Sequence, residues 1–138
     1  MIEINNLTKY PVDKKSFTQV AKKILLSENK GIETVSLALV GKEEMQKLNK
    51  KFRNIDKPTD VLSFSAEGGP ASGWEETLGE IVICPEVVKE KGEKIMEVFV
   101  HGVLHLCGYD HEKSEKEAEE MEKKEDFYFK KLKIKNFQ

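Results

Sequence analysis

The feature of this sequence that most restricts its fold is the eleven-residue segment His101–His111, which contains all three histidines of the chain. His101 and His105 are four residues apart, so a helix would place both imidazoles on one face, about 5–6 Å apart at Cβ. Gly108 favours a positive φ that ends such a helix and turns the chain back. The segment therefore predicts a helix and a tight turn that bring His111 toward the other two histidines.

Three imidazoles gathered in this way predict a catalytic metal site. Catalytic zinc sites use three protein ligands and keep the fourth position for water, whereas structural sites are closed by four. Neutral imidazoles favour zinc, with nickel or another transition metal as the alternative. We expect one Zn²⁺ per chain on His101, His105 and His111. Asp110, beside His111, is a candidate either to orient a ligand imidazole or to cap a turn.

The histidine spacing also matches a protease pattern, H-E-x-x-H-x-x-G-x-x-H, at every fixed position but one. The glutamate that serves as general base in those proteases is replaced by Gly102. A glycine inside a helix costs roughly 1 kcal/mol relative to alanine, so something needs the space, either a close backbone or a substrate. A metalloprotease is therefore an alternative that Gly102 disfavours.

The order of patterns along the chain predicts one α+β domain, residues 1–138. Alternating or β-branched runs predict a small mixed sheet of about four strands at 2–7, 34–40, 61–64 and 80–83. Apolar residues at helical spacing predict helices around 17–25, 45–52 and 93–106, and Pro85 can start another. Ser114 with Glu117 forms a capping box for a last helix that runs to about Leu132.

Composition says more about the compartment and the general partners of the protein than about the reaction it catalyses. Charged residues make up 35% of the chain, yet the net charge is −2, so no global attraction to nucleic acid is expected. We expect no signal peptide and no membrane span, because no apolar stretch is long enough. Cys84 and Cys107 form no CxxC pair, which favours a reducing, cytoplasmic compartment.

Arg53 is the single arginine among 23 basic residues. A guanidinium presents a planar fork that suits a phosphate group, which lysine cannot copy. The alternative is a structural ion pair. Lys50, Lys51 and Lys57 lie nearby in the sequence and are weaker candidates for binding the phosphates of a nucleic acid, since such lysines usually form a solvated face.

Three segments of the chain resemble the YbeY family of bacterial endoribonucleases. His101–His111 is similar to the family signature H-G-x-L-H-L-x-G-Y-D-H. Leu48–Arg53 with Pro58–Phe64, and Leu78–Ile83, match as well. Ser65 stands where the family often has proline, and Cys84 where serine is common. The resemblance covers nearly the whole chain, and the histidine signature is very specific.

The resemblance implies a zincin-like core and one zinc on the three histidines. It also implies a metal-dependent hydrolase that cleaves single-stranded RNA, acting in 3′-end maturation of 16S rRNA and in ribosome quality control on the small ribosomal subunit. The functionally important arginine of the family falls on Arg53.

A third hypothesis for the function is a ribosome-associated binding module with a structural zinc, which would need a fourth ligand from Cys107 or Asp110. The oligomeric state is left open.

Overall fold

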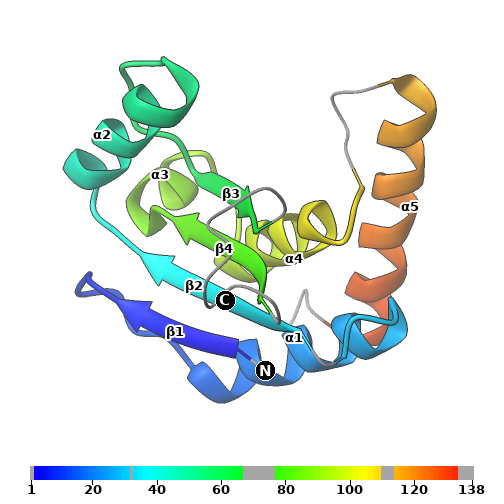
Figure 1. Cartoon of the computed structure of the whole chain (residues 1–138). Coiled ribbons are helices and arrows are strands. Elements are labelled where there is room, and N and C mark those ends of the chain that lie inside the picture. The colour runs from blue at the N-terminus through cyan, green and yellow to red at the C-terminus, as the bar shows by residue number, and fades with distance from the viewer. Residues whose placement is uncertain (1, 32, 67–76, 110–113, 134–138) are drawn as a thin grey trace.

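The computed structural model describes residues 2–31, 33–66, 77–109 and 114–133 (Figure 1). Within these ranges the strands are β1 (Ile2–Asn6), β2 (Thr34–Leu39), β3 (Val61–Ser65) and β4 (Thr77–Ile83). The helices are α1 (Lys14–Ser27), α2 (Lys42–Arg53), α3 (Pro85–Glu90), α4 (Ile95–Leu106) and α5 (Glu115–Lys131). The predicted α+β class is confirmed, and every predicted strand and helix is present.

The four strands form one mixed sheet in the order β1-β2-β4-β3. β1 and β4 run parallel to β2, and β3 pairs antiparallel with β4 at the sheet edge. β4 begins at Thr77, three residues before the predicted start, because Thr77 pairs with Thr34 and Gly79 pairs with Ser65. The ladder with both neighbours therefore extends the strand beyond its run of apolar residues.

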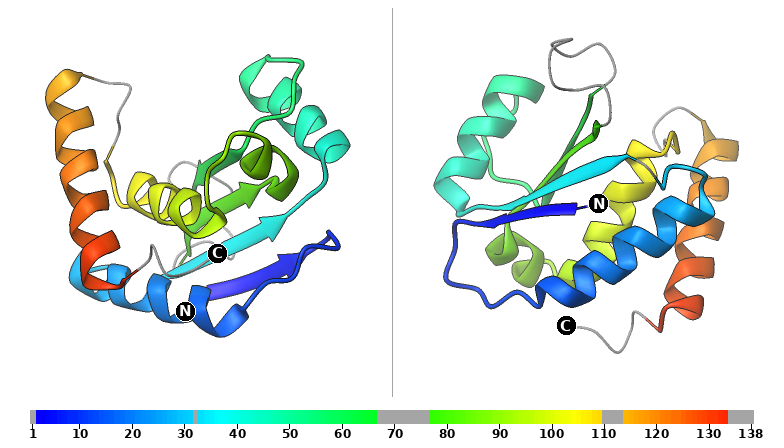
Figure 2. Two further views of the ribbon diagram at one scale, coloured as in Figure 1. Left: turned by 180° about the vertical axis from the view of Figure 1, so that it is seen from behind. Right: turned by 60° about the horizontal axis from the view of Figure 1, so that its bottom comes forward.

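Alternation along the strands supplies two apolar faces, and helices cover both. Val35, Leu37 and Leu39 of β2 belong to the main core, which α1 and α4 complete. On the other face, Leu62 and Val82 pack with Met45 of α2. Figure 2 shows α1 and α4 on one side of the sheet and α2 on the other. The active-site candidates on α2 and α4 are thus carried by opposite layers.

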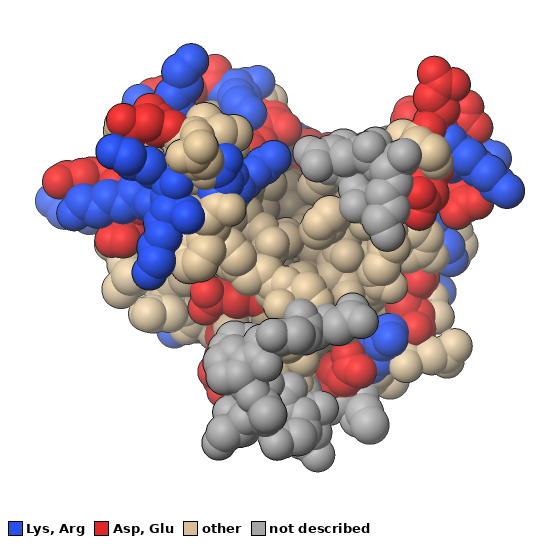
Figure 3. All heavy atoms as spheres, turned by 45° about the horizontal axis from the view of Figure 1, so that its top comes forward, with Lys and Arg blue, Asp and Glu red and all other residues tan. Residues whose placement is uncertain are grey.

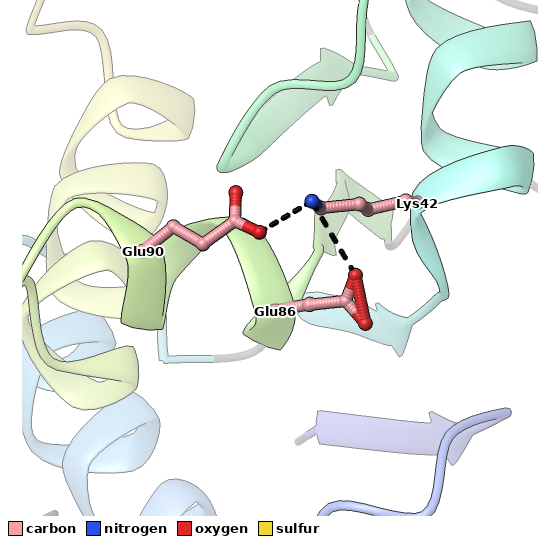
Figure 4. Close-up of polar contacts among 3 residues, drawn as sticks. All are labelled: Lys42, Glu86 and Glu90. Carbon is pink, nitrogen blue, oxygen red and sulfur yellow. Dashed lines mark hydrogen bonds and ion pairs between the residues drawn. The ribbon is translucent and has the colours of Figure 1, made fainter.

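The two helices that flank this arrangement are fixed by polar contacts at their starts. The Ser114 hydroxyl accepts a hydrogen bond from the Glu117 amide at 3.1 Å, which confirms the predicted cap of α5. Lys42, the first residue of α2, bonds to Glu90 and lies 3.6 Å from Glu86, both on α3 (Figure 4). These side chains are about half exposed, so the ion pairs orient α2 more than they stabilise the fold.

Among the described residues, no helix is long and apolar enough to span a membrane.

Candidate active site

A cleft of about 750 Å³ opens where α2, β3, α4 and α5 meet. Its lining from α2 is Phe52 and Arg53, and from β3 and the preceding turn Thr59 to Phe64. The opposite wall consists of Glu93, Glu97, Val98, His101, His105, Glu125 and Phe129. Three residues that the sequence predicts to be functional therefore line the same cleft: Arg53, His101 and His105. Arg53 is far from the two histidines in the sequence, so the fold brings them together.

The two described histidines occupy one face of α4, as their spacing predicts. Both side chains are half-buried. His101 Nδ1 lies 3.4 Å from Glu125 Oε2 on α5, and this contact raises the pKa of His101 above its usual value. When Nδ1 carries the proton, Glu125 orients the ring and leaves Nε2 to act as a metal ligand. The two described imidazoles are therefore donors of the kind that transition metals bind.

Gly102 is required by the packing of α4 on the sheet rather than by the cleft. It is buried, and a Cβ at this position would lie 3.0–3.3 Å from three side-chain atoms of Ile81 on β4. The space that the sequence indicated is thus filled by the neighbouring strand. Gly108 takes φ +112° after the end of α4, which confirms the predicted turn.

Arg53 is the last residue of α2 and its side chain is exposed at the cleft. The turn after the helix is held in place by its own polar groups. Asn54 adopts a left-handed conformation with φ +60°, and the buried Asn49 donates from Nδ2 to the Lys57 carbonyl oxygen at 2.8 Å. These contacts hold the backbone at the end of α2, where Arg53 is attached, in one conformation.

The lysines named from the sequence do not line the cleft. Lys50, Lys51 and Lys57 are exposed. Lys50 Nζ lies 3.9 Å from Asp56 Oδ2, and Lys51 Nζ lies 5.2 Å from the ring centroid of Phe52. Figure 3 shows basic side chains gathered over α2, beside a hollow of mostly uncharged surface.

A carboxyl pair, Asp60 and Glu93, lies at the other end of the cleft lining. Partial burial and the hydrogen bond that protonated Glu93 donates to the Asp60 carboxylate raise the pKa of Glu93 to about 7. Asp60, despite burial, keeps a lowered pKa, because Glu93, Lys91 and the Val61 amide stabilise its charge. A carboxyl group that titrates near neutrality can both accept and donate a proton.

Two of the predicted site residues, Asp110 and His111, lie outside the described part of the chain. Among the residues that are described, no group of three or more His, Cys, Asp and Glu side chains is arranged to hold a metal. The predicted three-histidine site is therefore represented by two of its members. Cys107 packs against the main core.

Sequence patterns did not identify Glu93 and Glu125 as cleft residues. Glu125 belongs to α5, a helix rich in Glu and Lys, which is a composition typical of a solvated face. Its signal was available in the spacing, because Met121 and Tyr128 are buried on α5 and Glu125 falls on the same face. Glu93 precedes α4 and had no such signal.

Comparisons with known proteins agree with this arrangement. The sequence model of the family described as Endoribonuclease YbeY matches residues 3–133. A protein named Endoribonuclease YbeY from Thermotoga neapolitana is 39% identical over 122 residues, which cover 83% of this chain and 76% of that protein. Another of the same name, from Francisella tularensis subsp. novicida, is 43% identical over 99 residues, covering 64% of this chain and 60% of the relative.

A solved structure is similar over most of both chains. The solution structure of TM1509 from Thermotoga maritima has a TM-score of 0.61 and 34% sequence identity, and the match covers 96% of this chain and 89% of that one. The family match, residues 3–133, includes the residues that line the cleft and the helix that bears His101 and His105.

Proposed function

Because this chain belongs to the YbeY family of endoribonucleases, we propose that it is a zinc-dependent endoribonuclease that cleaves single-stranded RNA. The observation that carries the proposal is that Arg53, His101 and His105 line one cleft. A guanidinium suits a phosphate, and a pair of imidazoles suits a transition metal. Together they provide the two positive centres that cleavage of a phosphodiester requires.

His101, His105 and His111 would hold one Zn²⁺ per chain, with nickel or another transition metal as the alternative. When bound, zinc polarises a phosphodiester oxygen or lowers the pKa of a bound water toward about 7. Glu125 orients the His101 ring through Nδ1. Gly102 permits α4 to lie close to β4 and so fixes the height of both histidines above the sheet.

Arg53 has the role of neutralising charge that develops on the phosphate. The Asn49 hydrogen bond and the left-handed Asn54 hold the backbone at the end of α2, from which the Arg53 side chain reaches the cleft. The lysines around it supply sequence-independent attraction to RNA phosphates, which acts over the basic surface of α2.

We further propose that the substrate is ribosomal RNA, at the 3′ end of 16S rRNA, and that the protein works in the cytoplasm with the small ribosomal subunit. The family name supports the endonuclease class. The local basic surface supports an RNA partner in a chain whose net charge is only −2.

The protease alternative is disfavoured by Gly102. The position of the general-base glutamate in the protease pattern faces Ile81 and not the cleft, so no carboxylate fits there. The binding module with a structural zinc is disfavoured because Cys107, one of its two candidate fourth ligands, packs against the core.

The test is metal content and cleavage measured on the same preparations. The purified protein should contain about one transition metal per chain and should cleave single-stranded RNA, but not duplex RNA or casein, with full loss in chelator. His101→Ala, His105→Ala and His111→Ala should lose both metal and cleavage. Cys107→Ser is the matched control and should keep both.

Three outcomes would contradict the proposal. Zinc-dependent cleavage of casein without cleavage of RNA would establish the protease. Loss of zinc from Cys107→Ser would indicate a four-ligand structural site, and full metal occupancy in all three histidine variants would remove the proposed site.

A further inference from the structure

Phe52 is an exposed aromatic side chain in a place where the fold gains little from it. Phe52 is 55% exposed to solvent. Of the large hydrophobic residues that are exposed in the described part of the chain, Phe52 is the one that lines the cleft. An apolar ring at the rim of a polar site suggests contact with a ligand that has a flat face.

The ring of Phe52 is held by a second aromatic residue. Its centroid lies 5.0 Å from that of Phe64 on β3, with an angle of 63° between the rings. Phe64 also lines the cleft and packs against the smaller core cluster beneath α2. Edge-to-face pairs of this kind contribute about 0.5–1.5 kcal/mol beyond area burial, so the contact with Phe64 favours one orientation of the Phe52 ring.

Positive charge accompanies the ring on both sides in the sequence. Arg53 follows Phe52 and lines the same cleft, and Lys51 Nζ lies 5.2 Å from the ring centroid. A ligand that binds here meets an aromatic surface and cationic groups together. An RNA strand matches that pattern, because each nucleotide joins a base with a π-face to an anionic phosphate.

We propose that Phe52, supported by Phe64, stacks on an unpaired nucleobase next to the phosphate that Arg53 binds. The inference rests on the proposed function and adds a base subsite to it. Bases of a duplex are already stacked and paired, so only a single strand offers one to the ring. Stacking tolerates any base, so the subsite selects for single strands rather than for sequence.

The chain offers a matched control in Phe127 on α5. Phe127 is 48% exposed, lies 5.0 Å from Tyr128 in edge geometry, and has Lys124 and Lys131 over its ring at 5.8 and 5.3 Å. It thus shares exposure, aromatic neighbour and nearby lysines with Phe52, but it does not line the cleft.

The experiment measures cleavage of a short single-stranded RNA by metal-loaded wild type, Phe52→Leu, Phe52→Tyr and Phe127→Leu. Leucine keeps the apolar bulk but lacks the aromatic face. For Phe52→Leu we expect KM to rise about tenfold with kcat changed much less, because stacking contributes uniform binding. Phe52→Tyr and Phe127→Leu should behave as wild type, and all four should melt within a few degrees of each other.

A second substrate series identifies the base. Removing one base at a time, with ribose and phosphate kept, should raise KM for wild type at one position beside the cleaved bond. In Phe52→Leu that same abasic RNA should cause no further loss, since the two changes remove one contact.

The outcomes separate this inference from the proposed function. RNA neither cleaved nor bound by wild type would overturn the proposed function and the subsite with it. Normal cleavage by wild type with an unchanged KM in Phe52→Leu would overturn the subsite alone. A loss confined to kcat would also overturn it, because Phe52 would then act by positioning Arg53. Equal losses in Phe52→Leu and Phe127→Leu would indicate a general surface effect and contradict it as well.

Discussion

At the scale of single residues, Arg53 shows how charge and geometry can be separated. Arg53→Lys keeps the positive charge but loses the planar fork that can meet two phosphate oxygens. We expect the RNA cleavage rate to fall by about 10²–10³, the scale of removing one transition-state donor. Metal content should not change, and RNA affinity should fall much less, because the exposed lysines of α2 persist.

Thermal melting of the same protein distinguishes this role from a structural one. Arg53 is exposed, so Arg53→Lys should melt within a few degrees of wild type. Lys22→Ala, which removes an exposed charge on α1 outside the cleft lining, serves as the control and should cleave at nearly the normal rate. Near-normal cleavage by a stable Arg53→Lys protein would exclude Arg53 from the reaction.

The same scale shows what residue patterns could reveal before a structure. His101 and His105 were predictable because helical spacing alone decides that they share a face. Glu125, the partner of His101, was not identified, because it lies 24 residues later on another helix, and no local pattern gives the packing of that helix against α4. The spacing of residues within one helix or strand predicts which of them share a face. The packing angle between two elements cannot be predicted from such spacing.

At the scale of elements, Gly102 joins α4 to the sheet. Alanine would improve helix propensity by roughly 1 kcal/mol, but its Cβ would press on the buried Ile81. Overpacking typically costs about 1–3 kcal/mol, so we expect Gly102→Ala to lower the free energy of unfolding by about 1 kcal/mol. Urea denaturation measures it, and Ile81→Val, which deletes one of the three crowding atoms, should reduce the loss. A Gly102→Ala protein more stable than wild type would show that Ile81 yields.

A second contact between elements is centred on Glu28, the residue that caps α1. Its carboxylate accepts hydrogen bonds from Tyr109 at 2.8 Å and Tyr128 at 2.5 Å and lies 3.3 Å from Lys124 Nζ. Although burial opposes it, these donors lower the pKa of Glu28. The cluster therefore ties α1 to α5 and to the turn after α4.

Glu28→Gln should destabilise the protein by about 1–3 kcal/mol at pH 7, since it removes the charge that these donors stabilise. A lowered carboxyl pKa contributes stability above its unfolded value, and that stability is lost as the pH falls through the folded pKa. The gap between wild type and variant should thus shrink in acid. Melting curves at pH 7 and pH 3 test this, with the exposed Glu3→Gln as control. A gap that grew in acid would contradict the assignment.

At the scale of the whole molecule, the cleft explains why the fold was easier to predict than the site. Strands and helices follow from patterns within each segment, and their order was sufficient for the α+β class. The cleft, in contrast, is assembled from residues 52–64, 93–105 and 125–129, which meet only when α2, α4 and α5 have packed around β3. Only the folded structure shows that the cleft lining with the two histidines also includes Phe52, Asp60 and Glu93.

The electrostatics of the assembled cleft give the last prediction, which concerns Glu93. Folding raises its pKa from 4.5 to about 7, by burial and by its hydrogen bond with Asp60. A raised carboxyl pKa means that the folded protein favours the protonated form. The associated stability is complete below pH 4.5 and is lost as the pH rises through 7.

Glu93→Gln should preserve the hydrogen bond to Asp60 without the charge that appears above pH 7. We expect the variant and wild type to melt together at pH 4, below the unfolded pKa of 4.5. At pH 8 the variant should melt about 2–4 °C higher, because solvent screening at the exposed Glu93 leaves about 1 kcal/mol or less. His101, Lys91 and Glu125 near the pair are the same in both proteins, so their titration largely cancels in the difference. Glu122→Gln, exposed on α5, should show equal small shifts at both pH values. A Glu93→Gln protein that melts below wild type at pH 8 would mean that the Glu93 charge stabilises the cleft instead of opposing it.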